Sequence, residues 1–331
     1  MKRVIGFADR IIHIAGDGSA EINLPEEILK RSEIAPPIVH LARALGLSQV
    51  GLSVRDVRRM TEDIRSAGKD AEIIKPKLGE VTIAAKNLNL SYQSKPALRN
   101  VTTTIYTGEI VALMGRNGAG KSSLLTSLVG LNKEASGSSQ ISGIDSAELK
   151  GKVRREIVGF IPQEPSDLLY GQSVAGECAQ ADKDNECAPG TALALLERIV
   201  PAIDSNTHPR DLSEGQRLAL ALAIVLSAQP QVLILDEPTR GLDYQSKALL
   251  ITLLKSFAKE LNRSVLIATH DVELVAELCD RVIFLSEGEV VADGPTLEIL
   301  LSSPAFAPQV AKVMSPRPWL TVSDVMKAVT Q

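Results

Sequence analysis

The feature that most constrains this sequence is a glycine-rich segment between an apolar run and a helical pattern. Residues 115–122 fit the pattern G-x-x-x-x-G-K-[ST], the loop that wraps the phosphates of a nucleoside triphosphate. The run 110–114 before this loop predicts a buried strand, and residues 122–129 after it predict a helix. Strand, glycine loop and helix in this order predict an α/β fold with a phosphate site at a strand end.

Each position of this loop is a candidate nucleotide contact. The glycines allow successive backbone N–H groups to point inward, and the helix N-terminus adds partial positive charge. Lys121 would reach the outer phosphates, and the Ser122 hydroxyl would bind Mg²⁺. The candidate nucleotide-binding residues here are Gly115, Arg116, Asn117, Gly118, Ala119, Gly120, Lys121, Ser122 and Ser123.

The composition excludes several classes of protein. The 331 residues carry a net charge of −4 without a long basic block, which argues against nucleic acid as the main partner. The three cysteines form no C-x-x-C pair, so we expect neither a disulfide framework nor a zinc site, and a reducing compartment fits. The longest apolar run, 218–228, is too short to span a membrane, so work at a membrane would need another protein to hold this one there.

Other apolar runs predict further strands of an α/β sheet. An alternating pattern over residues 81–92 and the run 101–105 predict two half-buried strands. Three continuous runs predict strands that end in polar residues: 157–161 before Gln163, 232–235 before Asp236 and Glu237, and 265–269 before His270. Because ligands bind at the carboxyl ends of parallel strands, we expect these side chains to share a cleft with the phosphate loop.

The polar residues at these strand ends suit nucleotide chemistry. Asp236 follows an apolar strand, as a carboxylate that serves Mg²⁺ in a phosphate-loop enzyme should. Glu237 is the candidate base for an attacking water. Two adjacent acids are also compatible with ordinary charge at a helix N-terminus, and a single histidine such as His270 with a simple polar strand end.

Residues 81–301 resemble the ATP-binding cassette (ABC) ATPases. The resemblance depends on several motifs in the family's order, and a signature followed closely by an acidic strand end is specific to it. The matching segments are the Walker A loop 115–122, Gln163 as the Q-loop glutamine, Leu212–Gln216 as the signature, 232–237 as the Walker B strand, Gly241–Asp243 as the D-loop, His270 as the switch histidine and Tyr92 as the aromatic that stacks on adenine.

The resemblance implies a P-loop NTPase of ABC type. Its fold would combine a mostly parallel core sheet with flanking helices, an antiparallel β-subdomain and a helical subdomain at about residues 164–228. The implied catalytic residues are Lys121, Gln163, Glu237 and His270; the magnesium residues are Ser122, Gln163 and Asp236; and the further nucleotide contacts are Tyr92, Ser213, Gly215, Gln216 and Asp243. Glu214 departs from the pattern, because the family has glycine there.

The resemblance also implies partners. In the family two cassettes pack head to tail around two ATP molecules, so a second ABC ATPase subunit is expected, together with a separate transmembrane subunit at the cytoplasmic face of the membrane. Similarity to the energy-coupling factor type favours import of a vitamin or a metal ion. Two alternatives stay open: a soluble ABC-type ATP switch acting on ribosomes or DNA, and a catalytically inactive interaction subunit.

The sequence contains a partial internal repeat. Residues 7–14 resemble 278–285, residues 25–29 resemble 295–300, and residues 52–57 resemble 320–325. The phosphate loop occurs once. We therefore predict that residues 1–78 are the remnant-like tail of a preceding ABC domain plus a linker, loosely attached to an ABC ATPase domain at 79–331. The alternative is a coincidence of common strand–turn–helix patterns.

Overall fold

The computed structural model describes residues 8–14, 18–32, 34–67, 79–200 and 203–330. The chain divides into two compact units, one of residues 76–296 and the other of residues 1–75 together with 297–331. The last 35 residues thus group with the N-terminal segment, whereas the sequence placed them in the ATPase domain. The reason is apolar packing, because helices from both ends of the chain share one buried cluster. The origin of residues 1–78 in a preceding cassette stays a prediction.

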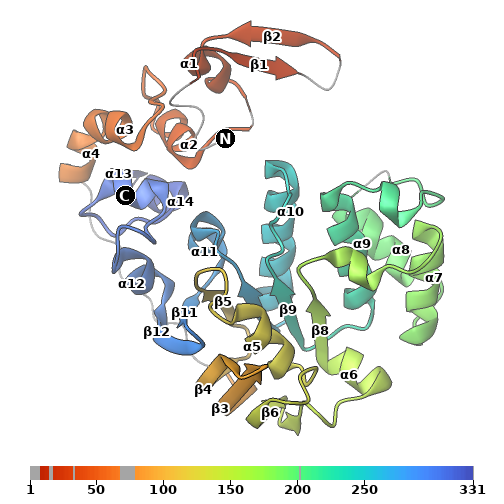
Figure 1. Cartoon of the computed structure of the whole chain (residues 1–331). Coiled ribbons are helices and arrows are strands. Elements are labelled where there is room, and N and C mark those ends of the chain that lie inside the picture. The colour runs from red at the N-terminus through yellow and green to blue at the C-terminus, as the bar shows by residue number, and fades with distance from the viewer. Residues whose placement is uncertain (1–7, 15–17, 33, 68–78, 201–202, 331) are drawn as a thin grey trace. The chain divides into compact units, whose positions relative to one another are not determined.

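The larger unit contains a six-stranded sheet in the order β12-β11-β5-β10-β9-β8 (Figure 1). Its strands are β5 (Ile110–Met114), β8 (Val158–Ile161), β9 (Val232–Asp236), β10 (Ser264–Ala268), β11 (Arg281–Ser286) and β12 (Glu289–Pro295). Neighbours pair in parallel except β12, which is antiparallel to β11. All residues of β5, β9 and β10 are buried, as continuous apolar runs in the centre of a parallel sheet should be.

A second, antiparallel sheet has the order β4-β3-β6-β7. Its strands are β3 (Val81–Tyr92), β4 (Lys95–Tyr106), β6 (Ser136–Ile141) and β7 (Ile144–Asp145). Helix α5 (Lys121–Leu128) contacts strands of both sheets, and its leucines join a core cluster drawn from both. The expected fold class, an α/β core with an antiparallel subdomain, is confirmed.

Helices fill the rest of this unit. Those after β7 are α6 (Gly151–Ile157), η2 (Pro165–Leu168), α7 (Val174–Asp184), α8 (Thr191–Ile199), η3 (Pro209–Asp211) and α9 (Glu214–Ser227), followed by α10 (Tyr244–Lys255), the π-helical turn η4 (Ser256–Glu260) and α11 (Val272–Leu278). Helices α7, α8 and α9 bury their apolar sides in a separate cluster. Within the described ranges, no helix combines the length and apolarity that crossing a bilayer requires.

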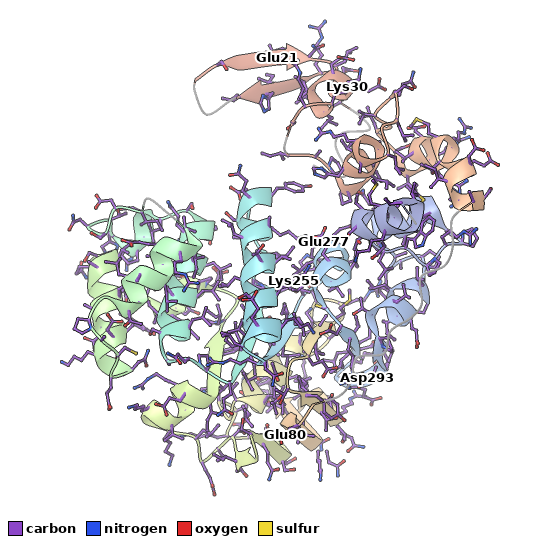
Figure 2. The ribbon with its side chains drawn as sticks, turned by 180° about the vertical axis from the view of Figure 1, so that it is seen from behind. Glu21, Lys30, Glu80, Lys255, Glu277 and Asp293 are labelled. Atoms are coloured by element: carbon purple, nitrogen blue, oxygen red, sulfur yellow. The ribbon has the colours of Figure 1, made fainter. Side chains whose placement is uncertain are left out.

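The smaller unit joins both ends of the chain. Its elements are β1 (Ile11–Ile14), β2 (Ala20–Asn23), α1 (Pro25–Leu29), α2 (Pro37–Ala44), α3 (Val54–Met60), α4 (Glu62–Ala67), α13 (Gln309–Met314) and α14 (Val322–Thr330), with α12 (Thr296–Leu301) at the boundary. Helices α2 and α3 share a buried cluster with α13 and α14, in which Val57, Trp319 and Val325 are fully buried. Glu21 and Lys30, labelled in Figure 2, lie on the surface of this unit.

Arginines tie the two ends of the chain together. Arg58 donates hydrogen bonds to the carbonyls of Lys312 and Val313, both at 3.1 Å. In return Arg317 donates to the carbonyls of Arg65 at 2.6 Å and Ser66 at 3.2 Å. These carbonyls lie near the ends of α13 and α4, where helices leave acceptors unsatisfied. Each end of the chain therefore caps a helix of the other.

Candidate nucleotide and magnesium site

The phosphate loop connects β5 to α5 and is held close to neighbouring backbone. Gly115 has a φ of 156°, and a Cβ there would lie 2.3 Å from the carbonyl oxygen of Leu285. Gly120 has a φ of 103°, and a Cβ there would lie 2.4 Å from the carbonyl oxygen of Ala97. Both positions require glycine, because backbone atoms cannot move aside as a flexible side chain can.

We expect Gly120→Ala to weaken nucleotide binding at least tenfold, because a left-handed alanine costs about 1–3 kcal/mol and must also push β4 away. Titration with a fluorescent ATP analogue measures this. Gly143→Ala is the matched control: its φ of 78° is similarly strained, but open space surrounds it in the turn between β6 and β7. Unchanged affinity in Gly120→Ala would contradict the assigned geometry.

Lys121 begins α5 and is only 7% exposed. Its Nζ donates to the carbonyl of Gly115 at 3.1 Å and of Arg116 at 3.4 Å, and lies 3.6 Å from Oε1 of Glu237. The ammonium group is thus held inside the loop by two carbonyls and one carboxylate. Such a desolvated positive charge suits contact with phosphate oxygens.

Asp236 ends β9 and is 4% exposed. Burial raises the pKa of its carboxyl above the usual value, while a hydrogen bond with the Ser122 side chain opposes this rise. Its Oδ1 is buried and has no hydrogen-bond partner among the described residues. A buried carboxylate oxygen without a partner, beside a serine hydroxyl, fits the hard-oxygen shell that Mg²⁺ prefers.

Glu237 directly follows β9 in an unusual conformation. Its φ is 49°, which is uncommon for a residue with a side chain, and its N–H donates to the carbonyl of Ala268 at 2.8 Å. The carboxylate is 11% exposed, and its Oε2 lies 2.8 Å from Nδ1 of His270, which is 73% exposed. The turn therefore places Glu237 between the buried Lys121 and the exposed His270.

A cavity of about 210 Å³ opens beside Glu237, and the exposed Gln163 lines it. Glu164 and Arg240 also line this cavity and form an ion pair at 2.6 Å. Sequence reasoning missed these two residues. The signal available was their position, since Glu164 follows Gln163 and Arg240 lies three residues after Glu237.

The signature residues begin α9, where they make local contacts. The Ser213 hydroxyl accepts from the N–H of Gln216 at 3.3 Å, and the Gln216 side chain accepts from the N–H of Ser213 at 3.0 Å, a capping box. Glu214, the departure from the family pattern, pairs with Arg217 at 2.9 Å. These partners lie on α9, and Glu214 also lines the cavity beside Glu237, so the first turn of α9 borders the same cavity as the candidate base.

Three other predicted contacts are placed as follows. Gly215 packs against α10, where an added Cβ would lie 2.7 Å from the Ser246 Oγ. The Asp243 side chain caps α10 by accepting from the N–H of Ser246 at 2.7 Å. Tyr92 ends β3 before a tight turn and is 47% exposed, so part of the residue is accessible to a ligand.

The fold and these residues define a P-loop nucleotide-binding cassette, because the loop, the two acids and the histidine lie at the carboxyl ends of β5, β9 and β10, which are parallel neighbours in one sheet. Residues 98–240 match the family model described as ABC transporter. A Gloeobacter violaceus protein named "Putative ABC transporter ATP-binding protein" is 38% identical over 229 residues, which cover 66% of this chain and 91% of that protein. The chain belongs to the ABC transporter ATP-binding family.

Other relatives show how far the likeness extends. A Streptomyces coelicolor protein of the same description is 44% identical over 365 residues, covering 100% of this chain and 64% of that protein. The chain therefore spans less than two thirds of that relative. Among solved structures, CbiO1 of Clostridium perfringens, part of the ABC transporter complex cbiONQ, has a TM-score of 0.59 at 30% identity and covers 70% of this chain and 95% of its own. The cassette MJ0796, a dimer with ADP and phosphate, has a TM-score of 0.59 at 28% identity, covering 65% and 98%.

Proposed function

We propose that this chain is the ATP-hydrolysing subunit of an ABC-type membrane transporter. The observation that carries the proposal is the convergence of Lys121, Asp236, Glu237 and His270 at the ends of adjacent parallel strands. Cassettes of this family bind ATP with Mg²⁺, and the charges gathered here match those needs.

Each of these residues has a separate role in ATP hydrolysis. Ser122 and Asp236 would hold Mg²⁺, which neutralises phosphate charge when bound. Lys121 leaves the loop carbonyls to stabilise negative charge on the outer phosphates. Glu237 accepts a proton from the water whose oxygen attacks the γ-phosphorus, and the bond to the bridging oxygen breaks to give ADP and phosphate. His270 orients the Glu237 carboxylate through their contact at 2.8 Å.

A second cassette would complete each site. The capping box leaves Ser213 exposed at the N-terminus of α9, an end suited to phosphate. The dimeric state of the similar cassette MJ0796, bound to ADP and phosphate, supports this arrangement. Ser213 and Gly215 of one cassette would therefore contact the nucleotide held by Lys121 of the other.

Ser213→Ala tests this arrangement, and we expect it to lower ATP turnover about ten- to a hundredfold, since a bond to a charged phosphate is lost. Mixing the Ser213→Ala protein with the Lys121→Ala protein should restore part of the ATP turnover. In a mixed dimer the intact loop of the serine variant meets the intact signature of the lysine variant, so random pairing restores about a quarter of the sites. Phosphate release from each variant and from the mixture measures this. No recovery on mixing, with dimers formed, would contradict the shared site.

We further propose coupling to a separate membrane protein at the cytoplasmic face, in a transporter of the energy-coupling factor type that imports a vitamin or a metal ion. The likeness to CbiO1, part of the cbiONQ transporter complex, supports this type. Affinity purification of the chain from detergent-solubilised membranes tests it. Co-purification of an integral membrane protein is the expected result, whereas co-sedimentation with ribosomes alone would favour the soluble switch.

A further inference from the structure

Strand β1 of the hairpin β1–β2 resembles strand β11 of the hairpin β11–β12 in sequence, but its surroundings differ. Residues 8–14 align with residues 279–285, so Asp9-Arg10 corresponds to Asp280-Arg281, and Ile12 and Ile14 correspond to Ile283 and Leu285. Comparing the two copies shows which contacts the N-terminal hairpin lacks.

In the C-terminal copy, β11 is covered on both edges. It pairs antiparallel with β12 and in parallel with β5, the strand that leads into the phosphate loop. Ile283 and Leu285 are 1% and 0% exposed, and both join the main core cluster. The hairpin therefore closes the sheet of the cassette.

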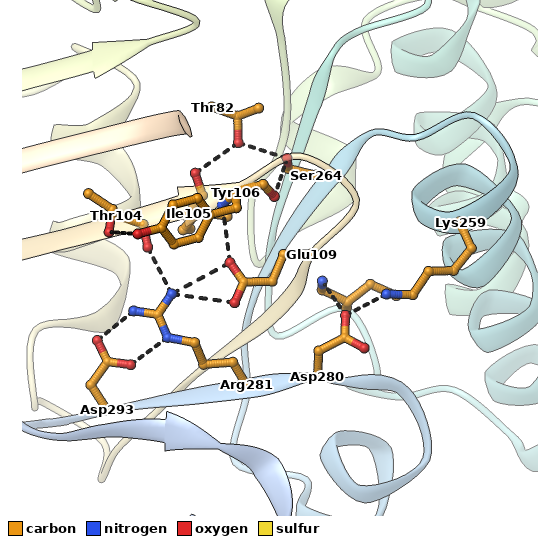
Figure 3. Close-up of polar contacts among 11 residues, drawn as sticks. Thr82, Thr104, Ile105, Tyr106, Glu109, Lys259, Ser264, Asp280, Arg281 and Asp293 are labelled. Atoms are coloured by element: carbon orange, nitrogen blue, oxygen red, sulfur yellow. Dashed lines mark hydrogen bonds and ion pairs between the residues drawn. The ribbon is translucent and has the colours of Figure 1, made fainter. Parts of the chain in front are cut away.

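Polar contacts fix the beginning of β11 against β5 (Figure 3). Asp280 Oδ2 accepts from the N–H of Ile110, the first residue of β5, at 2.9 Å. Arg281 Nη1 lies 3.4 Å from Oε1 of Glu109, while its Nε binds Asp293 at 2.6 Å. The Asp-Arg pair thus recognises a backbone N–H and an acidic side chain at the beginning of the phosphate-loop strand.

In the N-terminal copy, β1 pairs with β2 in a sheet of two strands, so its other edge is open within the described residues. Ile12 is 62% exposed and Ile14 is 74% exposed, whereas their counterparts are buried. Asp9 and Arg10 are exposed and, in the part of the chain that the structure describes, make no hydrogen bond or ion pair. An open edge lined with exposed isoleucines is a surface ready to accept a strand.

We propose that the open edge of β1 is a docking surface for the core of a second ATP-binding cassette that lacks its own closing hairpin. The phosphate-loop strand of that core pairs in parallel with β1, as β5 pairs with β11. Asp9 and Arg10 bind the N–H and the acidic residue at the beginning of that strand, and Ile12 and Ile14 enter its core. The pairing needs no ATP, so it does not depend on the proposed hydrolysis.

Two observations select this occupant over an arbitrary strand. The correspondence runs residue by residue from Asp9 to Ile14, and covers both the polar pair and the two apolar positions. The S. coelicolor relative, which matches the whole of this chain, contains a further third of sequence beyond the match. That further sequence is therefore the partner tested first.

The first test is capture. The full chain, immobilised, is offered the part of the S. coelicolor relative that lies outside the match, without nucleotide. We expect capture by the wild-type chain and at least tenfold weaker capture by the variant Ile12→Asp with Ile14→Asp. Val291→Asp, on the exposed face of the closing hairpin β12 at 59% exposure, is the matched control and should bind as wild type. Absence of capture by a folded partner, or equal capture by the double variant, would overturn the proposal.

If that partner segment does not fold, a tandem chain tests the same docking. Residues 79–279 are placed directly ahead of residues 9–331, so that β1 takes the position of β11 in a second cassette. We expect this tandem to bind two ATP analogues per chain, and to bind one when Ile12→Asp and Ile14→Asp are introduced in β1. One nucleotide in the unaltered tandem would overturn the docking proposal, whereas none in the wild-type chain would instead overturn the proposed function.

Discussion

Replacing Lys121 by alanine is expected to abolish measurable ATP turnover. The ammonium group is buried and lies 3.6 Å from the Glu237 carboxylate. The other full positive charge among the described loop residues 115–122 is that of Arg116, whose side chain is exposed. Losing one pre-aimed group of this kind typically costs about 3–4 kcal/mol, or two to three decades in rate. Phosphate release at saturating ATP, together with analogue titration, measures both turnover and binding.

A surface lysine separates this effect from a general loss of charge. Lys152 pairs with Glu186 on the surface of the same unit, and Lys152→Ala should leave the melting curve unchanged, because exposed ion pairs contribute little to stability. Its turnover should match that of the wild type. If Lys121→Ala hydrolysed ATP at the normal rate with a normal melting curve, the assigned phosphate site would be wrong.

Glu237→Gln is expected to retain ATP and stop hydrolysing it. Glutamine keeps the shape of the side chain and a contact to His270, but it cannot accept a proton from water. General-base catalysis contributes about 10²–10⁴-fold, so turnover should fall by at least a hundredfold while binding stays within a few fold. The trapped complex should run as a dimer in gel filtration with ATP.

Glu186→Gln is the matched control for this variant, because the same chemical change is made at an exposed carboxylate. It should hydrolyse ATP normally and stay in its resting assembly state. A Glu237→Gln protein with normal turnover would refute the role of this residue as base, and one that no longer bound ATP would assign it a binding role instead.

Much of the larger unit follows from local patterns. The apolar runs around 110–114, 232–235 and 265–269 predict central strands, and all three are found there, because a strand buried on both faces needs apolar residues at every position. By contrast, helix α10 changes to a π-helical turn at Ser256. Such a change depends on tertiary packing and has no local signature.

The site was predictable in its residue types but not in its geometry. Lys121, Asp236, Glu237 and His270 could be named from their positions after strands. The left-handed φ of Glu237 could not, nor could the lack of a hydrogen-bond partner for Asp236 Oδ1 among the described residues, because both depend on how neighbouring strands constrain the backbone. The shared core of α2, α3, α13 and α14 was missed for a similar reason, since it joins residues from the two ends of the chain.

That shared core has a consequence for synthesis on the ribosome. Arg58 and Val313, which are bonded in the finished protein, are separated by 255 positions in the chain. At elongation rates of about 5–20 residues per second, the N-terminal helices emerge roughly 10–50 s before their partners exist. Throughout that interval Leu41, Val57 and their neighbours lack the part of the cluster that α13 and α14 supply, so the nascent chain exposes apolar surface to chaperones while residues 76–296 are still being translated.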